Sequence, residues 1–223
     1  MIAENLRSIR GRLPQGVELV CVSKYHAVSQ IKEAYDVGER VFGESHVQEL
    51  LLKHQQLPDD VKWHFIGHLQ TNKVRQIIPF VSLIHSVDSV RLMDEINRQA
   101  EKIGRVVDCL VEVRVAQEET KYGFLPGEVC EVLNESAVQQ YPYIRFRGLM
   151  CMASNTDDVN RVVSDFNVLN DLFASLKHTT FSQSPAFDIR SMGMSGDWPL
   201  AVMHGSNMVR IGTAIFGERD YAR

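Results

Sequence analysis

The strongest constraint on the fold is a repeated alternation of short apolar runs with amphipathic stretches. Several of the apolar runs are almost continuous in Val, Ile, Leu, Phe and Cys, as strands covered on both faces of a sheet are. Eight strands that alternate with helices predict a parallel (β/α)₈ barrel. The eight runs cover residues 19–23, 40–42, 63–66, 83–86, 107–113, 145–149, 187–192 and 208–211.

Helix start and stop signals stand in the intervals between these runs. Ser29 is a predicted N-cap of a helix that closes at Gly38. Asp88 or Ser89 is a predicted N-cap of a second helix, which ends at Gly104. A side-chain oxygen at the first position and a glycine after the last are typical of helix ends. These signals therefore support helices between the strands of the barrel.

Apolar periodicity predicts two further helices, over residues 2–13 and 159–176. The first precedes the first strand, so it is an addition to the barrel. An open doubly wound sheet is the structural alternative, but such a sheet usually carries a Gly-x-Gly-x-x-Gly fingerprint, and none follows the first strand. The last strand ends close to residue 223, so we expect a single barrel domain over residues 1–223.

The bulk properties exclude several classes of protein. The chain has 223 residues, a formal net charge of −4 and no basic stripe interleaved with aromatics, so nucleic acid is not an expected partner. Its apolar runs are far shorter than the roughly 20 residues that span a bilayer. The charged N-terminus lacks the apolar segment of a secretion signal. We therefore expect a cytoplasmic protein with no membrane partner, and a monomer.

Residues at the ends of the predicted strands are the candidates for chemistry, because barrel active sites are built there. Lys24 follows the first strand, and Ser195 and the pair Gly212-Thr213 follow the last two. The loops after strands seven and eight often bind phosphate, through backbone N–H groups and hydroxyls. A lysine amine next to a phosphate site indicates pyridoxal 5′-phosphate (PLP), whose aldehyde reacts with amines.

The residues at the strand ends are also compatible with two other kinds of site. His64, His68 and His85 are possible metal ligands, but no carboxylate completes the set, so no metal is expected. His64 and His85 also fit buried core histidines. An acid pair of Glu44 and Asp88 is a further alternative, although nothing in the sequence fixes the distance between them.

Motifs along nearly the whole chain resemble the pyridoxal phosphate homeostasis protein family, single-domain relatives of the N-terminal barrel of alanine racemases. The resemblance implies a barrel that holds PLP as an aldimine on Lys24. It also implies phosphate contacts near Ser195, and Arg210 facing the pyridine nitrogen. The motifs are Val22-Ser23-Lys24, Phe42-Gly43-Glu44, Trp63-His64-Phe65-Ile66-Gly67-His68-Leu69-Gln70, Arg147-Gly148-Leu149-Met150, Ser191-Met192-Gly193-Met194-Ser195 and Val209-Arg210-Ile211-Gly212.

Among the departures from the family pattern, Ser45 stands where the family usually has Asn. The residues expected to contact the cofactor are Lys24, Ser45, His64, Met150, Ser195, Arg210, Gly212 and Thr213.

Arg210 bears on whether the protein is a carrier or a catalyst. An arginine stays protonated and does not give a proton to the pyridine nitrogen, so the ring is a weaker electron sink. Racemisation also needs acid–base groups on both faces of the substrate, and only Lys24 is assigned. We therefore predict a binding protein without catalytic residues, which takes part in intracellular vitamin B6 homeostasis and has apo-enzymes as possible recipients of PLP. A weak amino-acid racemase is the alternative.

Overall fold

Eight parallel strands close into a barrel in the computed structural model, which describes residues 1–116 and 122–218. The strands follow one another around the barrel in chain order, and β8 pairs with β1. This confirms the (β/α)₈ prediction and removes the open sheet. The strands are β1 (Glu18–Val22), β2 (Val41–Glu44), β3 (Lys62–Phe65), β4 (Leu83–Val87), β5 (Val107–Glu112), β6 (Ile144–Met150), β7 (Ile189–Ser191) and β8 (Met208–Ile211).

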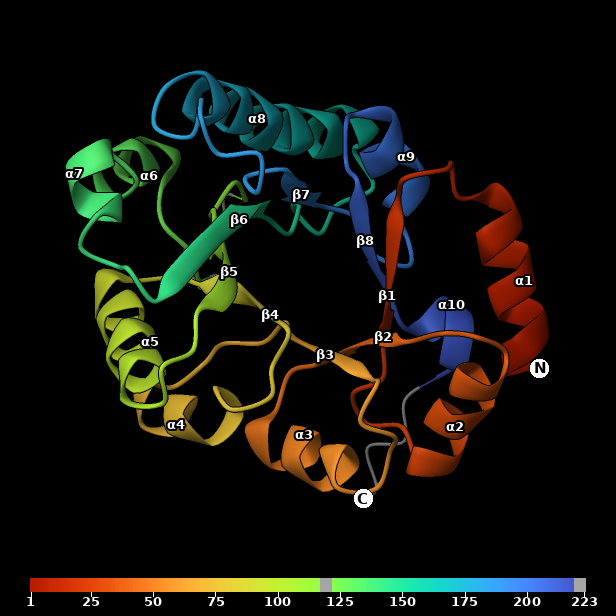
Figure 1. The fold of residues 1–223 in the computed structure, drawn as a ribbon. Coiled ribbons are helices and arrows are strands. Elements are labelled where there is room, and N and C mark those ends of the chain that lie inside the picture. The colour runs from red at the N-terminus through yellow and green to blue at the C-terminus, as the bar shows by residue number, and fades with distance from the viewer. Residues whose placement is uncertain (117–121, 219–223) are drawn as a thin grey trace.

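Helices surround the strands, as Figure 1 shows. The long α8 lies on the side of β6 and β7, and the shorter α2 and α3 lie on the side of β2 and β3. The helices are α1 (Ile2–Arg12), α2 (Val28–Asp36), α3 (Val47–His54), α4 (Val74–Ile77), α5 (Val90–Lys102), α6 (Pro126–Val132), α7 (Glu135–Val138), α8 (Val159–His178), α9 (Trp198–Met203) and α10 (Thr213–Phe216), with a 3₁₀ turn η1 (Thr71–Lys73) before α4.

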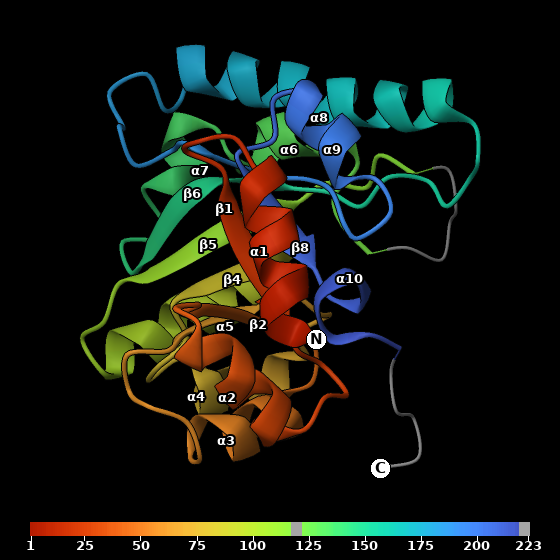
Figure 2. The same cartoon turned by 90° about the vertical axis from the view of Figure 1, so that its right-hand side faces the viewer.

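The predicted N-terminal helix is present as α1, which lies in front of β1 and β8 and beside α10 in Figure 2. Its apolar face is buried through Ile2, Leu6 and Ile9. The side-chain amide of Asn5 donates a hydrogen bond to the carbonyl oxygen of Ile215 at 2.9 Å. The helix is therefore anchored to the last element of the barrel by both apolar packing and a specific hydrogen bond.

Several predicted boundaries differ from the observed ones, and two of these differences are informative. The second strand continues past Phe42 to Glu44. The charged Glu44 can belong to the strand because its carboxylate is buried in an ion pair with Lys53 and is not solvated. The α2 helix begins at Val28, so Ser29 is not its N-cap. The Gln30 side chain instead accepts a hydrogen bond from the backbone N–H of Ala27 at 3.1 Å. For α5, the Ser89 hydroxyl is the cap, as predicted.

In the barrel interior, polar side chains lie toward the carboxyl ends of β4, β7 and β8, and apolar side chains precede them on the same strands. Side chains two residues apart on a strand point to the same face, so this arrangement follows directly from the strand sequences. Toward the carboxyl ends of β4, β7 and β8, Leu83 is followed by His85, Ile189 by Ser191 and Met208 by Arg210. The apolar side chains of the interior form one cluster of Val20, Val41, Leu83, Leu110, Met150, Ile189 and Met208, in which Met150 pairs with Ser191 at the end of β6.

A glycine accommodates a close approach of β6 to β7. The register between β5 and β6 shifts between Cys109 and Leu110, and Leu110 pairs with Gly148. Gly148 has φ +146, and a Cβ atom there would lie 1.8 Å from the carbonyl oxygen of Ile189. Only glycine fits this position, because any side chain would overlap the neighbouring strand.

The larger core lies between the barrel and the helices. Cys21, Cys109 and Cys151 are buried free thiols in it. Burial raises the pKa of the Cys151 thiol to about 12. Among the residues that the structure describes, none of the helices is long and apolar enough to cross a membrane.

Candidate functional site

A cavity of about 270 Å³ opens at the carboxyl ends of the strands. Five of the eight predicted site residues line it: Lys24, Ser195, Arg210, Gly212 and Thr213. They come from the ends of β1, β7 and β8, which are neighbours around the barrel. The remaining described residues of its wall are Val22, Ile66, Met152, Met194 and Gly196. The cavity thus combines an amine, a guanidinium, two hydroxyls and an apolar wall.

Lys24 is presented by a tight turn immediately after β1. The backbone N–H of His26 donates to the carbonyl oxygen of Ser23 at 3.1 Å, which closes a four-residue turn. Tyr25, the third residue of this turn, has φ +65. A positive φ at that position is the requirement of a type II turn, which usually places glycine there. Lys24 is the second residue of the turn, so the conformation of its neighbours sets the direction of its side chain.

The loops after β7 and β8 meet in one corner of the cavity. The Ser195 hydroxyl oxygen accepts hydrogen bonds from the backbone N–H groups of Gly212 at 3.2 Å and of Ala214 at 3.4 Å. A Cβ atom at Gly212 would lie 3.1 Å from the carbonyl oxygen of Val22, so the backbone there packs tightly against the end of β1. The corner therefore offers backbone donors and the Ser195 and Thr213 hydroxyls, a donor set suited to an oxyanion.

Arg210 of β8 reaches the cavity from the barrel interior. One terminal nitrogen of its guanidinium donates to Ser191, to the carbonyl oxygen at 2.9 Å and to the hydroxyl at 2.6 Å. The other donates to the carbonyl oxygen of Cys151 at 2.8 Å. None of the described residues accepts a hydrogen bond from its Nε, which leaves that donor for a ligand in the cavity. Burial lowers the pKa of Arg210 from its ordinary value, although an arginine remains charged at neutral pH.

A chain of buried hydrogen bonds continues from Arg210 across the barrel. The Ser191 hydroxyl lies 3.1 Å from His85 Nδ1, and His85 Nε2 lies 3.0 Å from His64 Nδ1. The Ser191 hydroxyl, which accepts from Arg210, and the two imidazole rings thus form one continuous polar chain through the barrel interior. Burial lowers the pKa of His64 to about 3 and that of His85 well below its ordinary value, so both rings are neutral at pH 7.

Three predicted site residues lie outside the cavity wall. His64 belongs to the hydrogen-bond chain beneath the cavity, and Met150 to the apolar cluster of the interior. Ser45 lines a neighbouring hollow with residues that include His46, Gln48 and His68. These three are therefore not among the residues that line the Lys24 cavity.

The alternative sites do not assemble. His68 lies outside the hydrogen-bond chain, where its Nδ1 is 2.7 Å from a carboxylate oxygen of Asp88. Glu44 is bonded to Lys53 and Ser23, so it does not pair with Asp88. Among the described residues, no group of three His, Cys, Asp or Glu side chains could hold a metal ion.

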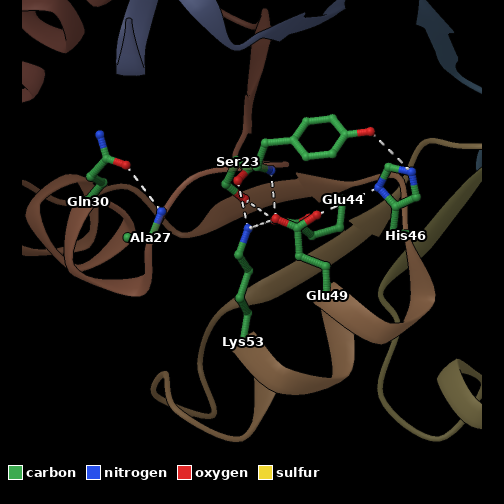
Figure 3. Close-up of polar contacts among 8 residues, drawn as sticks. Ser23, Ala27, Gln30, Glu44, His46, Glu49 and Lys53 are labelled. Atoms are coloured by element: carbon green, nitrogen blue, oxygen red, sulfur yellow. Dashed lines mark hydrogen bonds and ion pairs between the residues drawn. The ribbon is translucent and has the colours of Figure 1, made fainter. Parts of the chain in front are cut away.

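Sequence reasoning missed a polar cluster beside the Lys24 turn, drawn in Figure 3. Lys53 of α3 is buried and binds Glu44, Glu49 and the carbonyl oxygen of Ser23, each at 2.7 Å. Glu49 and Lys53 stand four residues apart on one helix, a spacing typical of ion pairs. That spacing was the available signal, but it does not reveal that the pair is buried.

Comparison with known proteins agrees with this geometry. A model of the family described as "Alanine racemase, N-terminal domain" matches residues 1–220. A pyridoxal phosphate homeostasis protein of Vibrio alginolyticus is 39% identical over 217 residues, which cover 95% of this chain and 91% of the relative. A homologous protein of Escherichia coli K12 with the same name is 35% identical, with 100% of this chain and 98% of the relative covered.

Solved structures extend the comparison. PipY of Synechococcus elongatus, solved with PLP bound, is 36% identical, covers 97% of this chain and 100% of its own, and superposes with a TM-score of 0.87. An alanine racemase of Streptomyces lavendulae, only 19% identical and matched over 56% of its length, shares the fold with a TM-score of 0.77. With its barrel, its cavity and these relatives, the chain belongs to the alanine racemase N-terminal domain family and, within it, to the pyridoxal phosphate homeostasis proteins.

Proposed function

We propose that this protein binds PLP in the cavity at the barrel mouth and takes part in intracellular PLP homeostasis without catalytic turnover. The observation that carries the proposal is the meeting of Lys24, Arg210 and the Ser195–Gly212 corner in a single cavity. Its volume of about 270 Å³ is near the lower end of ligand pockets, which span roughly 300–1,000 Å³, and suits a ligand with one ring. The PLP-bound relative supports the same ligand.

The donor set of the cavity fits each part of PLP. Lys24 supplies the amine that would form a covalent bond to the aldehyde carbon. The Ser195 and Thr213 hydroxyls would hold the phosphate, together with the backbone N–H groups of Gly212 and Ala214, which donate to Ser195 in the unliganded protein. Arg210 would place its Nε opposite the pyridine nitrogen, while its terminal nitrogens stay fixed on Ser191 and Cys151. Bound PLP would supply an electrophilic aldehyde on an electron-withdrawing ring.

The wall of the cavity favours storage over turnover. Among its described residues, only Lys24 and Arg210 carry ionisable side chains, and Arg210 is a poor proton donor because its pKa is high. Proton transfer at a substrate carbon by a positioned group contributes about 10²–10⁴-fold to a rate, so a missing partner for Lys24 would be a severe loss. The apolar residues Ile66, Met152 and Met194 cover the rest. PLP released from Lys24 would pass to apo-enzymes.

The covalent link is tested by trapping. Purified protein is incubated with one equivalent of PLP, reduced with borohydride and mapped by mass spectrometry. We expect the reduced adduct on Lys24, its loss in Lys24→Ala, and its retention in the control Lys32→Ala, which removes an exposed lysine of α2. Retention of a stoichiometric adduct in Lys24→Ala would refute the assignment.

Catalysis is tested on the same preparation. L- and D-alanine are incubated with PLP-loaded protein in deuterium oxide, and exchange at the α-carbon is followed by NMR while transfer of PLP to an apo-enzyme is assayed in parallel. We expect transfer without exchange above that of free PLP. Exchange at the rate of an enzyme, with no transfer, would favour a racemase instead.

A further inference from the structure

Lys53 is the one buried lysine among the described residues, and all three of its protons are used. Its side chain reaches from α3 toward the end of β1 (Figure 3). Its Nζ donates to the carbonyl oxygen of Ser23, to Glu44 Oε1 and to Glu49 Oε1, each at 2.7 Å. An ammonium has three donors and no acceptor, so these contacts fix the position of Nζ completely.

The acceptors of Lys53 belong to the turn that carries Lys24. The carbonyl oxygen of Ser23 accepts from Lys53 and from His26 N–H, which closes the turn. Glu49 Oε1 accepts from Lys53 and, at 2.6 Å, from the backbone N–H of Tyr25. The backbone on both sides of Lys24 is therefore attached to the same ammonium, directly through Ser23 and through Glu49 to Tyr25.

Glu44 completes this cluster from β2. Its Oε1 accepts a hydrogen bond from the Ser23 hydroxyl at 2.5 Å as well as the one from Lys53. Its Oε2 is buried and has no hydrogen-bond partner among the described residues. Burial raises the pKa of Glu44 to about 7, against the opposing effect of Lys53.

The turn needs such support because its conformation is strained. Tyr25 is the one described residue other than glycine with a positive φ. The left-handed conformation costs a residue with a side chain on the order of 1–2 kcal/mol. Residues in such conformations persist when their surroundings hold them, and they gather at functional sites. Here one of the contacts that hold the residue is the Glu49 carboxylate on the backbone N–H of Tyr25.

Stability alone does not account for a buried lysine with two carboxylates. Apolar side chains of similar volume are often equally or more stabilising than a buried ion pair, because removing charges from water is costly. A cluster of this kind does fix geometry, since each charged partner has only one arrangement that satisfies it. Its position around the neighbours of Lys24 points to the geometry that it fixes.

We propose that Lys53 is a positioning residue, which acts through Glu49, Glu44 and Ser23 to hold the turn of residues 23–26 so that Lys24 faces the cavity. The proposal deepens the proposed function and rests on it, because the advantage of the geometry is bond formation between Lys24 and PLP. It assigns Lys53 no contact with the cofactor.

The first measurement needs no cofactor. Lys53→Met keeps the length of the side chain and removes the ammonium. In hydrogen–deuterium exchange of the unliganded protein, we expect residues 23–26 to exchange faster by about 10-fold or more, the order for losing a hydrogen bond to a charged group. Exchange in α5 and α8 should stay unchanged. Wild-type protection of the turn in Lys53→Met would overturn the proposal.

The second measurement separates positioning from binding. The rate of borohydride-trapped adduct formation in Lys53→Met should fall by about 10-fold or more, for the same lost hydrogen bond. In a Lys24→Ala background, adding Lys53→Met should leave the affinity for non-covalent PLP unchanged. Leu92→Ala, in a fully buried position of α5, is the control for lost stability and should keep the wild-type adduct rate. A normal adduct rate in Lys53→Met would overturn the proposal.

A pair of milder variants covers the case in which Lys53→Met does not fold. Glu49→Gln keeps an oxygen that accepts from Tyr25 and Lys53, whereas Glu49→Ala removes it from a partly exposed position. We expect a nearly normal adduct rate in Glu49→Gln and a reduced rate with faster exchange of the turn in Glu49→Ala. Equal behaviour of the two variants would contradict the proposed route through Glu49. If the wild type forms no adduct at all, the proposed function fails. Hydrogen–deuterium exchange of residues 23–26 then still decides whether Lys53 holds the turn.

Discussion

The buried histidine pair gives a sharp prediction for the pH dependence of stability. His64 is neutral in the folded protein, with a pKa near 3, whereas in the unfolded chain its ordinary pKa is 6.5. A folded-state pKa below the unfolded one means that the stabilisation is complete above pH 6.5 and is lost as the pH falls toward 3. At pH 5 the unfolded chain is protonated at this site and the folded protein is not.

The size of the change in unfolding free energy follows from the difference between pH 5 and the unfolded-state pKa of 6.5. At about 1.4 kcal/mol per pH unit, His64 should lower the free energy of unfolding by about 2 kcal/mol between pH 7.5 and pH 5. Because pH 5 lies well above the folded-state pKa, this figure does not depend on its exact value. Glu112, which is buried and has a pKa raised to about 7 by desolvation, has the opposite sign, since its stabilisation is lost as the pH rises through 7.

Because these contributions oppose each other, the pH dependence of the wild-type unfolding free energy does not isolate His64. The test is therefore the difference in unfolding free energy between the wild type and a variant. His64→Asn keeps an acceptor for His85 Nε2 and cannot be protonated. The stability of the wild type relative to His64→Asn should fall by about 2 kcal/mol between pH 7.5 and pH 5. Urea unfolding followed by the fluorescence of the buried Trp63 and Trp198 and by circular dichroism measures it. His178→Asn, at an exposed position of α8, is the control. A difference that is the same at both pH values refutes the reasoning.

Two further substitutions test the barrel and its phosphate corner. Ser195→Ala removes the hydroxyl that lies at the start of α10, and it should weaken the binding of PLP about 10–100-fold, the order for a hydrogen bond to a charged group. Calorimetry with pyridoxal, which lacks the phosphate, should show little change in affinity. An equal loss of affinity for both ligands would contradict the placement of the phosphate. Gly148→Ala puts a Cβ 1.8 Å from the carbonyl oxygen of Ile189 and should cost more than about 4 kcal/mol of stability or prevent folding; a urea midpoint equal to that of the wild type would contradict the close approach of the strands.

The fold, and the meeting of five candidate residues in one cavity, could be predicted from the sequence for one reason. In a parallel barrel every strand ends at the same rim, so residues that follow different strands must converge. Lys24, Ser195 and Gly212 are far apart in the chain, yet each follows a predicted strand, and the structure places all three on one cavity. The roles of Lys24 in covalent binding and of Arg210 toward the pyridine ring stay predictions until the variants are measured.

The sequence could not predict which buried side chains contact one another. Strand periodicity says that Glu44 and His64 lie on opposite faces of neighbouring strands, but not which side chains meet them. The packing of α3 brings Lys53 to Glu44, and the pairing of β3 with β4 brings His85 to His64.

By itself, then, the sequence determined a closed (β/α)₈ barrel and the residues at its mouth, because alternation and strand ends are local properties of the chain. The tertiary structure decided that Lys53 is buried against Glu44, that Tyr25 takes a left-handed conformation and that His64 and His85 are neutral. Each of these depends on burial and on partners 9 to 30 residues away. Desolvation and hydrogen bonding at such distances are set only when the layers pack.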